Sequence, residues 1–242
     1  MVNLANNFKD ILENFQKDKE NHNFPDSPLA KRILKDYNNE INDLVGKYSS
    51  NPGNFLVKSS VGRGKWVTNP WTGVMDFQVS NTFKKGFMFG YSYQIEDKKV
   101  YFRLTQGYEE FKNNPNELKR RADILKSKIS NIPEEFKNKN NLLDNGDIIG
   151  KCYNIEDLNN ETLENDFKYL FHVYEILVPE YLKISQDLSK DFKEILNNYK
   201  DAKNKPFKNN PLLKKINNDF SKNFHNLFYH NVNNSDFYKT KI

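Results

Sequence analysis

Cysteine is almost absent from this sequence, since Cys152 is the only one in 242 residues. A single cysteine excludes an internal disulfide framework and a cysteine-rich zinc site, and it suits a reducing compartment. The four histidines (His22, His172, His225 and His230) show no metal-ligand spacing. We therefore expect no metal ion and no cofactor, and we interpret Cys152 as a small buried hydrophobic residue.

Long apolar runs are also missing, and none approaches the roughly 20 residues that a membrane-spanning helix needs. Residues Met1 to Leu4 do not form a charged segment followed by an apolar stretch, so no secretory signal is expected. Hydrophobic residues make up only 37% of the chain, but an aromatic share of 14% partly offsets this, because Phe and Tyr bury a large area each. These features predict a soluble cytoplasmic protein with one generous domain, or one domain plus a helical appendage.

Charge of both signs is abundant, and the net charge of +5 is by itself weak evidence for a nucleic-acid partner. The distribution is more informative, because basic side chains occur at several separated points, as a surface that follows DNA phosphates requires. These points are Lys58, Arg63 and Lys65, then Lys84 and Lys85, then Lys119, Arg120 and Arg121. A solvated protein surface is the simpler explanation of any one cluster.

Helical periodicity marks both ends of the chain. Residues 4–48 predict two helices around a proline-containing break, with Ser27 capping the second helix. A strongly amphipathic helix is expected at 161–177, and Pro179 is expected to break or interrupt it. Further helices are expected at 117–129, 181–199 and 212–228.

Strands are expected between these helical segments. The clearest element is a hairpin in which aromatic residues alternate over 87–95, followed by a polar turn at 96–99 and a second strand at 100–104. Shorter strands are expected at 55–58, 75–79 and 148–153. Because helices bracket the sheet, the expected class is α+β, with a central curved, mainly antiparallel sheet, flanking helices and a C-terminal helical extension. We expect a first domain over residues 1–177 and a basic helical extension or linker over 178–242.

Two patterns imitate catalytic motifs. The Gly-rich stretch 62–65 resembles a phosphate-binding loop, but it continues into Trp66 instead of Ser or Thr at the start of a helix, which excludes an NTPase site. Asp76 and Glu96 imitate the carboxylates of metal-dependent nucleases. Glu96 stands at the expected tip of a hairpin, where charged residues are the default. We therefore keep a nuclease only as an alternative.

Both tryptophans lie in one short segment, residues 57–71. The glycines on either side of Arg63 would let the backbone approach a ligand closely. Trp66 and Trp71 stand beside cationic side chains, and aromatic planes next to cations are typical of nucleic-acid recognition. Packing in the core of the sheet is the better explanation for Trp66 and an equal alternative for Trp71.

This segment resembles the N-terminal domain of McrB, the DNA-binding subunit of McrBC-type modification-dependent restriction systems. The matching signature contains Val57, Lys58, Ser60, Gly62, Gly64, Trp66, Pro70 and Trp71. The similarity continues through residues 85–87, the aromatic hairpin, residues 104–108, residues 150–153 and the helix at 166–177. It covers roughly residues 1–177.

The resemblance implies binding of duplex DNA that carries a methylated or hydroxymethylated cytosine after a purine, with the modified base rotated into a pocket. Trp71 would be a stacking wall of that pocket, and Arg63, Met88 and Ser92 match other pocket positions. Arg63 replaces a tyrosine of a better-studied member, while Met88 and Ser92 replace an aromatic and an aliphatic residue. The modification bound here (5-methyl-, 5-hydroxymethyl- or N4-methylcytosine) could therefore differ from 5-methylcytosine.

The resemblance also places other activities outside this chain. A GTP-hydrolysing AAA+ motor and a McrC-like nuclease subunit are the expected partners, so we expect a recognition module, with no catalytic residue, and not an enzyme. The residues expected at the DNA backbone are Lys58, Ser60, Gly62, Gly64, Lys65, Lys84 and Lys85. The alternatives are a nuclease that uses Asp76 and Glu96, and a protein-interaction module formed by the aromatic sheet and the C-terminal helices.

Overall fold

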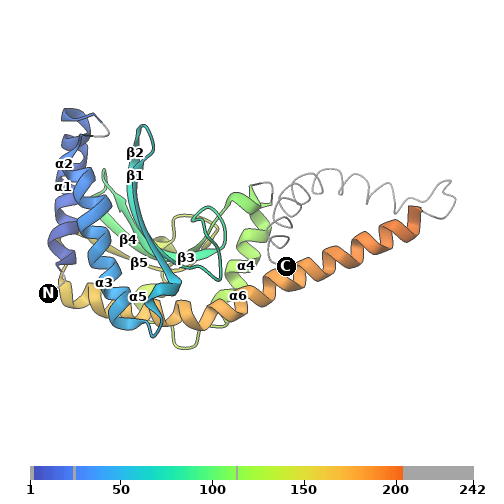
Figure 1. Ribbon diagram of the computed structural model, residues 1–242. Coiled ribbons are helices and arrows are strands. Elements are labelled where there is room, and N and C mark those ends of the chain that lie inside the picture. The colour runs from blue at the N-terminus through green and yellow to red at the C-terminus, as the bar shows by residue number, and fades with distance from the viewer. Residues whose placement is uncertain (1–2, 24–25, 113, 204–242) are drawn as a thin grey trace. The chain divides into compact units, whose positions relative to one another are not determined.

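The computed structural model describes residues 3–23, 26–112 and 114–203 (Figure 1). The chain divides into two compact units, Met1–Ile184 and Ser185–Ile242. The helix expected at 212–228 lies outside the described residues, and the domain boundary expected after Leu177 stays a prediction. Among the described residues, no helix has both the length and the apolar character to cross a membrane.

The first unit contains one five-stranded sheet in which every strand pairs antiparallel with its neighbour in sequence. Its strands are β1 (Phe55–Gly62), β2 (Trp66–Asp76), β3 (Phe87–Gln94), β4 (Lys99–Gln106) and β5 (Asp147–Asn154). In Figure 1 the sheet is curved and the β1–β2 hairpin extends beyond the other strands. Together with the flanking helices, this sheet confirms the α+β class.

The strand expected at 75–79 is wrong in extent, because β2 begins at Trp66 and ends at Asp76. A register shift explains how this turn-like stretch becomes a strand. Ser60 pairs with Trp71 and Gly62 with Trp66, so β2 bulges between these two pairs. Pro70 lies within the bulge, where its missing N–H disrupts no ladder hydrogen bond.

Seven helical segments of four or more residues flank the sheet in the described part of the chain. They are α1 (Leu4–Asn21), α2 (Pro28–Arg32), the π-helical η1 (Ile33–Tyr37), α3 (Asn38–Tyr48), α4 (Pro115–Ser127), α5 (Glu134–Lys137) and α6 (Asn160–Lys203). Short 3-10 turns are η2 (Pro52–Asn54), η3 (Glu109–Phe111), η4 (Lys139–Asn141) and η5 (Ile155–Asp157). The Ser27 cap is confirmed, since its hydroxyl accepts a hydrogen bond from the N–H of Ala30 at 2.8 Å.

The break expected at Pro179 is wrong, because α6 continues through it. Pro179 lies on the exposed side of the helix, while Val178 and Tyr181 on either side are buried. Packing of this apolar face compensates for the one backbone hydrogen bond that a proline removes.

Aromatic rings from α1 and α6 cover one face of the sheet. Phe8 of α1 lies 4.7 Å from Tyr91, and Phe167 of α6 lies 5.5 Å from Phe89, measured between ring centroids. Because side chains alternate along a strand, the residues between these core aromatics project from the other face of the sheet.

Trp66 is partly buried and packs against the core of this unit. Its ring meets Phe15 of α1 edge-on at 5.4 Å, and Phe15 is fully buried. The expectation that Trp66 is a packing residue is therefore confirmed.

Candidate nucleic-acid interface

One row of half-exposed side chains crosses the whole sheet on the face away from α1 and α6. Residues directly opposite each other on antiparallel strands project from the same face. The row contains one residue from each strand: Ser60, Trp71, Ser92, Tyr101 and Cys152. The adjacent row faces the helices, and all its members except half-buried Lys151 are buried: Ser59, Thr72, Tyr91, Phe102 and Lys151. We call the first set the Trp71 row.

Trp71 is supported from one side by Phe83. The two ring centroids lie 5.3 Å apart with an interplanar angle of 49°. Phe83 comes from the β2–β3 connection (residues 77–86) and lies over Gly73, where a Cβ atom would stand 2.6 Å from its ring. Because Gly73 carries no side chain, Phe83 can reach Trp71 and hold it. Trp71 itself stays half-exposed, so it offers a supported aromatic surface for stacking.

Ser92 is the direct cross-strand partner of Trp71 on β3. Its hydroxyl oxygen accepts a hydrogen bond from Nη2 of Arg103 at 2.9 Å. Met88 lies four residues earlier on β3 and therefore on the same face, but it is only 7% exposed. Three of the four predicted base-site residues thus share one face, and Met88 offers little accessible surface there.

Arg63 stands apart from these three, in the β1–β2 turn, and is exposed. It follows Ser60, the partner of Trp71, by three residues, or about 10 Å along the strand. Gly62 adopts a φ of 128°, and a Cβ there would stand 2.0 Å from the carbonyl oxygen of Lys65. The turn itself therefore requires this glycine, which the sequence pattern alone assigned to close approach of a ligand.

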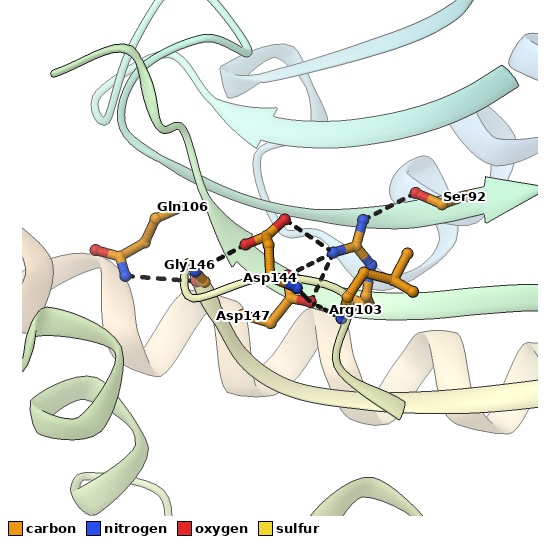
Figure 2. Close-up of polar contacts among 7 residues, drawn as sticks. Ser92, Arg103, Gln106, Asp144, Gly146 and Asp147 are labelled. Carbon is orange, nitrogen blue, oxygen red and sulfur yellow. Dashed lines mark hydrogen bonds and ion pairs between the residues drawn. The ribbon is translucent and has the colours of Figure 1, made fainter. Parts of the chain in front are cut away.

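Arg103 and Asp147 form a buried ion pair beside Ser92, as Figure 2 shows. Nη1 of Arg103 lies 2.6 and 2.7 Å from the two carboxylate oxygens of Asp147. The Arg103 side chain is 12% exposed and that of Asp147 is 0% exposed. Neither residue was singled out from the sequence, because no spacing rule links positions on β4 and at the start of β5.

Lysines lie at both ends of β2, the strand that carries Trp71. Lys65 is exposed in the turn before it, while Lys84 and Lys85 belong to the connection after it. Lys58 is exposed on β1, on the same face as the Trp71 row. Lys84 also lies 3.6 Å from a Glu109 carboxylate, but an exposed pair of this kind is weak and leaves the ammonium group available.

The basic run at 119–121 is not one surface cluster. Arg121 is buried at 6% exposure, and its guanidinium lies over the Phe111 ring at 4.6 Å. Arg120 is hydrogen bonded to Glu117 and, with Arg121, lowers the pKa of that carboxyl group. These arginines stabilise α4, and only Lys119 is left as an exposed and unpaired cation of this run.

The carboxylates of the nuclease alternative lie far apart. Asp76 ends β2 beside the start of β3, whereas Glu96 follows the end of β3, so about 25 Å of strand separates them. Asp76 is buried and its carboxylate accepts a hydrogen bond from the N–H of Gln78 at 2.7 Å. Among the described residues, no group of three or more His, Cys, Asp or Glu side chains is placed to hold a metal ion.

Cys152 is half-exposed in the Trp71 row, so its interpretation as a buried hydrophobic residue is wrong. Its neighbour across the sheet is Tyr101, and partial burial raises the pKa of both side chains. Both therefore stay neutral near pH 7, and the row carries no fixed charge at this end.

Comparison with known proteins identifies a family. The model described as "MrcB-like, N-terminal domain" matches residues 10–179, which is more than half of the chain and includes the whole sheet and the Trp71 row. No curated protein and no solved structure matches the chain. The chain therefore belongs to the MrcB-like N-terminal domain family, the DNA-binding recognition module of McrBC-type restriction systems.

Proposed function

We propose that this module binds duplex DNA containing a modified cytosine, and that it rotates the modified base out of the helix onto Trp71. The observation that carries the proposal is the position of Trp71: half-exposed, supported by Phe83, and on the face of the sheet that α1 and α6 leave open. Hydrolysis of GTP and cleavage of DNA then belong to other domains or subunits.

The free-energy cost of rotating the base out of the duplex is close to the gain from stacking it on the protein. Unpairing and unstacking one base costs a few kcal/mol. Stacking on an aromatic side chain returns about 1–3 kcal/mol per base. The remainder must come from contacts to the DNA backbone, which position the protein without selecting a sequence.

Three exposed lysines and the half-buried Lys85 supply those backbone contacts. Lys58, Lys65 and the Lys84–Lys85 pair lie on the face of the Trp71 row or at the two ends of β2, so they can reach phosphates on both sides of the flipped base. Binding should consequently weaken steeply as salt is raised, because each neutralised phosphate releases counterions.

A fluorescence-anisotropy titration tests the proposal. Matched duplexes carry cytosine, 5-methylcytosine, 5-hydroxymethylcytosine or N4-methylcytosine at one central site. We expect at least tenfold tighter binding, about 1.4 kcal/mol, of one modified duplex over the unmodified one. Trp71→Ala should remove this preference and retain weak, salt-sensitive binding to all four duplexes, while Trp71→Phe keeps part of it.

Folding of the variants is checked by urea denaturation monitored by circular dichroism. Equal binding of all four duplexes by the unaltered protein would reduce the proposal to a general DNA-binding surface. Absence of binding to any duplex would favour the protein-interaction alternative. Loss of folding in Trp71→Ala, with normal preference in Trp71→Phe, would make Trp71 a core residue.

A further inference from the structure

Beside Trp71, the structure holds one guanidinium group in a fixed orientation. The carboxylate of Asp147 contacts Nη1 of Arg103 through both oxygens, and it also accepts the N–H groups of Leu143 and Asp144 at 2.7 and 3.2 Å. Gly150 lies opposite Arg103, and a Cβ there would stand 3.0 Å from Cγ of the arginine. The buried carboxylate of Asp147, drawn in Figure 2, and the missing side chain of Gly150 together determine where the Arg103 side chain lies.

The guanidinium is not saturated by these contacts. Arginine carries five N–H donors. Nη1 donates to Asp147 and also lies 3.5 Å from an Asp144 carboxylate oxygen, and Nη2 donates to Ser92. Nε of Arg103 is buried and has no hydrogen-bond partner among the described residues. A buried donor without a partner is unfavourable, and it indicates a group arranged for a ligand or a water molecule.

Ser92 connects the buried Arg103 guanidinium to the accessible face of the sheet. Its oxygen is occupied as the acceptor of the Arg103 bond, so its own hydroxyl hydrogen is free to be donated elsewhere. Ser92 is half-exposed and is the cross-strand neighbour of Trp71. A base stacked on Trp71 therefore meets, at its edge, a hydroxyl donor that a buried cation polarises.

Such an edge distinguishes substituents by their hydrogen-bonding capacity. A methyl group placed against Ser92 would displace water from the hydroxyl and the guanidinium without replacing its hydrogen bonds. A hydroxymethyl group has an oxygen that can accept the hydrogen bonds these two groups donate. Sites built to bond a hydroxyl group discriminate strongly against the analogue that lacks it.

We propose that Ser92, positioned by Arg103 and Asp147, is the specificity-determining residue of the base site, and that it selects 5-hydroxymethylcytosine over 5-methylcytosine. This inference rests on the proposed function, because it requires a flipped base on Trp71. It adds the chemical class of the substituent, namely a hydrogen-bond acceptor on carbon 5 of the base.

The test measures the affinity ratio between 5-hydroxymethylcytosine and 5-methylcytosine duplexes in matched variants. For the unaltered protein we expect a ratio of at least ten. Ser92→Ala should bring the ratio close to one by weakening the hydroxymethyl duplex more than the methyl duplex, and Ser92→Thr, which keeps the hydroxyl, should retain the ratio. Ser60→Ala is the control, because Ser60 flanks Trp71 on the other strand and should change all duplexes equally.

The positioning role of Arg103 is tested by measuring the same affinity ratio in Arg103→Lys. Arg103→Lys keeps the positive charge beside Asp147 but cannot span Asp147 and Ser92 with one planar group. We expect its ratio to fall toward one, because the hydroxymethyl duplex loses more affinity than the methyl duplex when Ser92 is no longer held in place.

Two results would overturn the inference: a ratio of one or below in the unaltered protein, or a ratio that Ser92→Ala leaves intact. Either result can occur while modified DNA is still preferred over unmodified DNA. In that case the proposed function is kept and only the role of Ser92 is rejected. If no modified duplex is preferred and Trp71→Ala changes nothing, the proposed function itself is wrong and the inference falls with it.

Discussion

The main chain of Lys84 packs directly against Gly107, so that a Cβ atom at residue 107 would stand 2.4 Å from the carbonyl carbon of Lys84. The N–H of Gly107 donates to the carbonyl of Gly86 at 2.8 Å, and the N–H of Glu109 donates to that of Lys84 at 3.0 Å. The β2–β3 connection is thus attached to the end of β4. This attachment fixes Lys84, and with it Phe83, relative to Trp71.

Gly107→Ala should therefore displace the connection and weaken binding of every duplex several-fold, without changing which modification is preferred. We also expect a loss of about 1–3 kcal/mol in the free energy of unfolding, as for other overpacked sites. Anisotropy and urea denaturation measure the two effects. Gly46→Ala is the control, because the space around Gly46 in α3 is open and the change should stabilise the helix by about 0.5–1 kcal/mol. Wild-type affinity in Gly107→Ala would contradict this role of the connection.

Removing both lysines of the connection should reduce the salt dependence of DNA binding. Each phosphate contact contributes about 0.9 to the slope of log affinity against log salt, so Lys84→Ala with Lys85→Ala should lower the slope by about 1.8. Titrations of one duplex at several salt concentrations provide the slope. Lys17→Ala, an exposed change on α1, should leave it unaltered. An unchanged slope in the double variant would show that neither lysine meets a phosphate.

The ion pair between Arg103 and Asp147 should be needed for stability as well as for specificity. Asp147→Asn removes the buried counter-ion of Arg103 and leaves only the more exposed Asp144 carboxylate at 3.5 Å, and breaking one side of a buried pair typically costs about 3–5 kcal/mol. Glu134→Gln breaks an exposed pair with Lys137 and should change stability by less than about 0.5 kcal/mol. Urea denaturation of the two variants distinguishes them, and equal stabilities would mean that Asp147 does not anchor Arg103.

The rate at which the Cys152 thiol is alkylated should change when DNA binds. Burial raises the pKa of its thiol, and only the thiolate reacts. Alkylation by iodoacetamide should consequently be slower than that of free cysteine at neutral pH, and its rate should rise with pH through a midpoint above that of the free amino acid. DNA bound on the Trp71 row should slow the reaction further. A rate that DNA does not change would place the duplex on another surface.

Local pattern in the sequence predicts several elements of this fold directly. The alternating aromatics of 87–95 and the polar turn after them are the β3–β4 hairpin, and the helix cap at Ser27 is where its residue type indicates. The α+β class follows from such local signals, because strand and helix periodicities depend on residues that are neighbours along the chain.

The same local rules mislead where pairing or packing overrides them. Asn69 and Pro70 indicate a turn, yet β2 runs through them because β1 pairs alongside and a bulge accommodates the proline. Pro179 indicates a helix end, yet the buried face of α6 continues past it. Arg121 looks like a surface cation, yet it stacks on Phe111 inside the unit.

By itself, the sequence determined the family, the class of fold and the candidate segment around Trp71, since all three are carried by residue types at short spacings. Only the tertiary structure decided that Ser92 is the neighbour of Trp71, that Arg103 and Asp147 stand behind it, and that Arg63 does not share its row. The physical reason is the register of the sheet. A shift of one residue would turn every side chain of a strand to the other face, and turns, bulges and core packing far from the site determine that register.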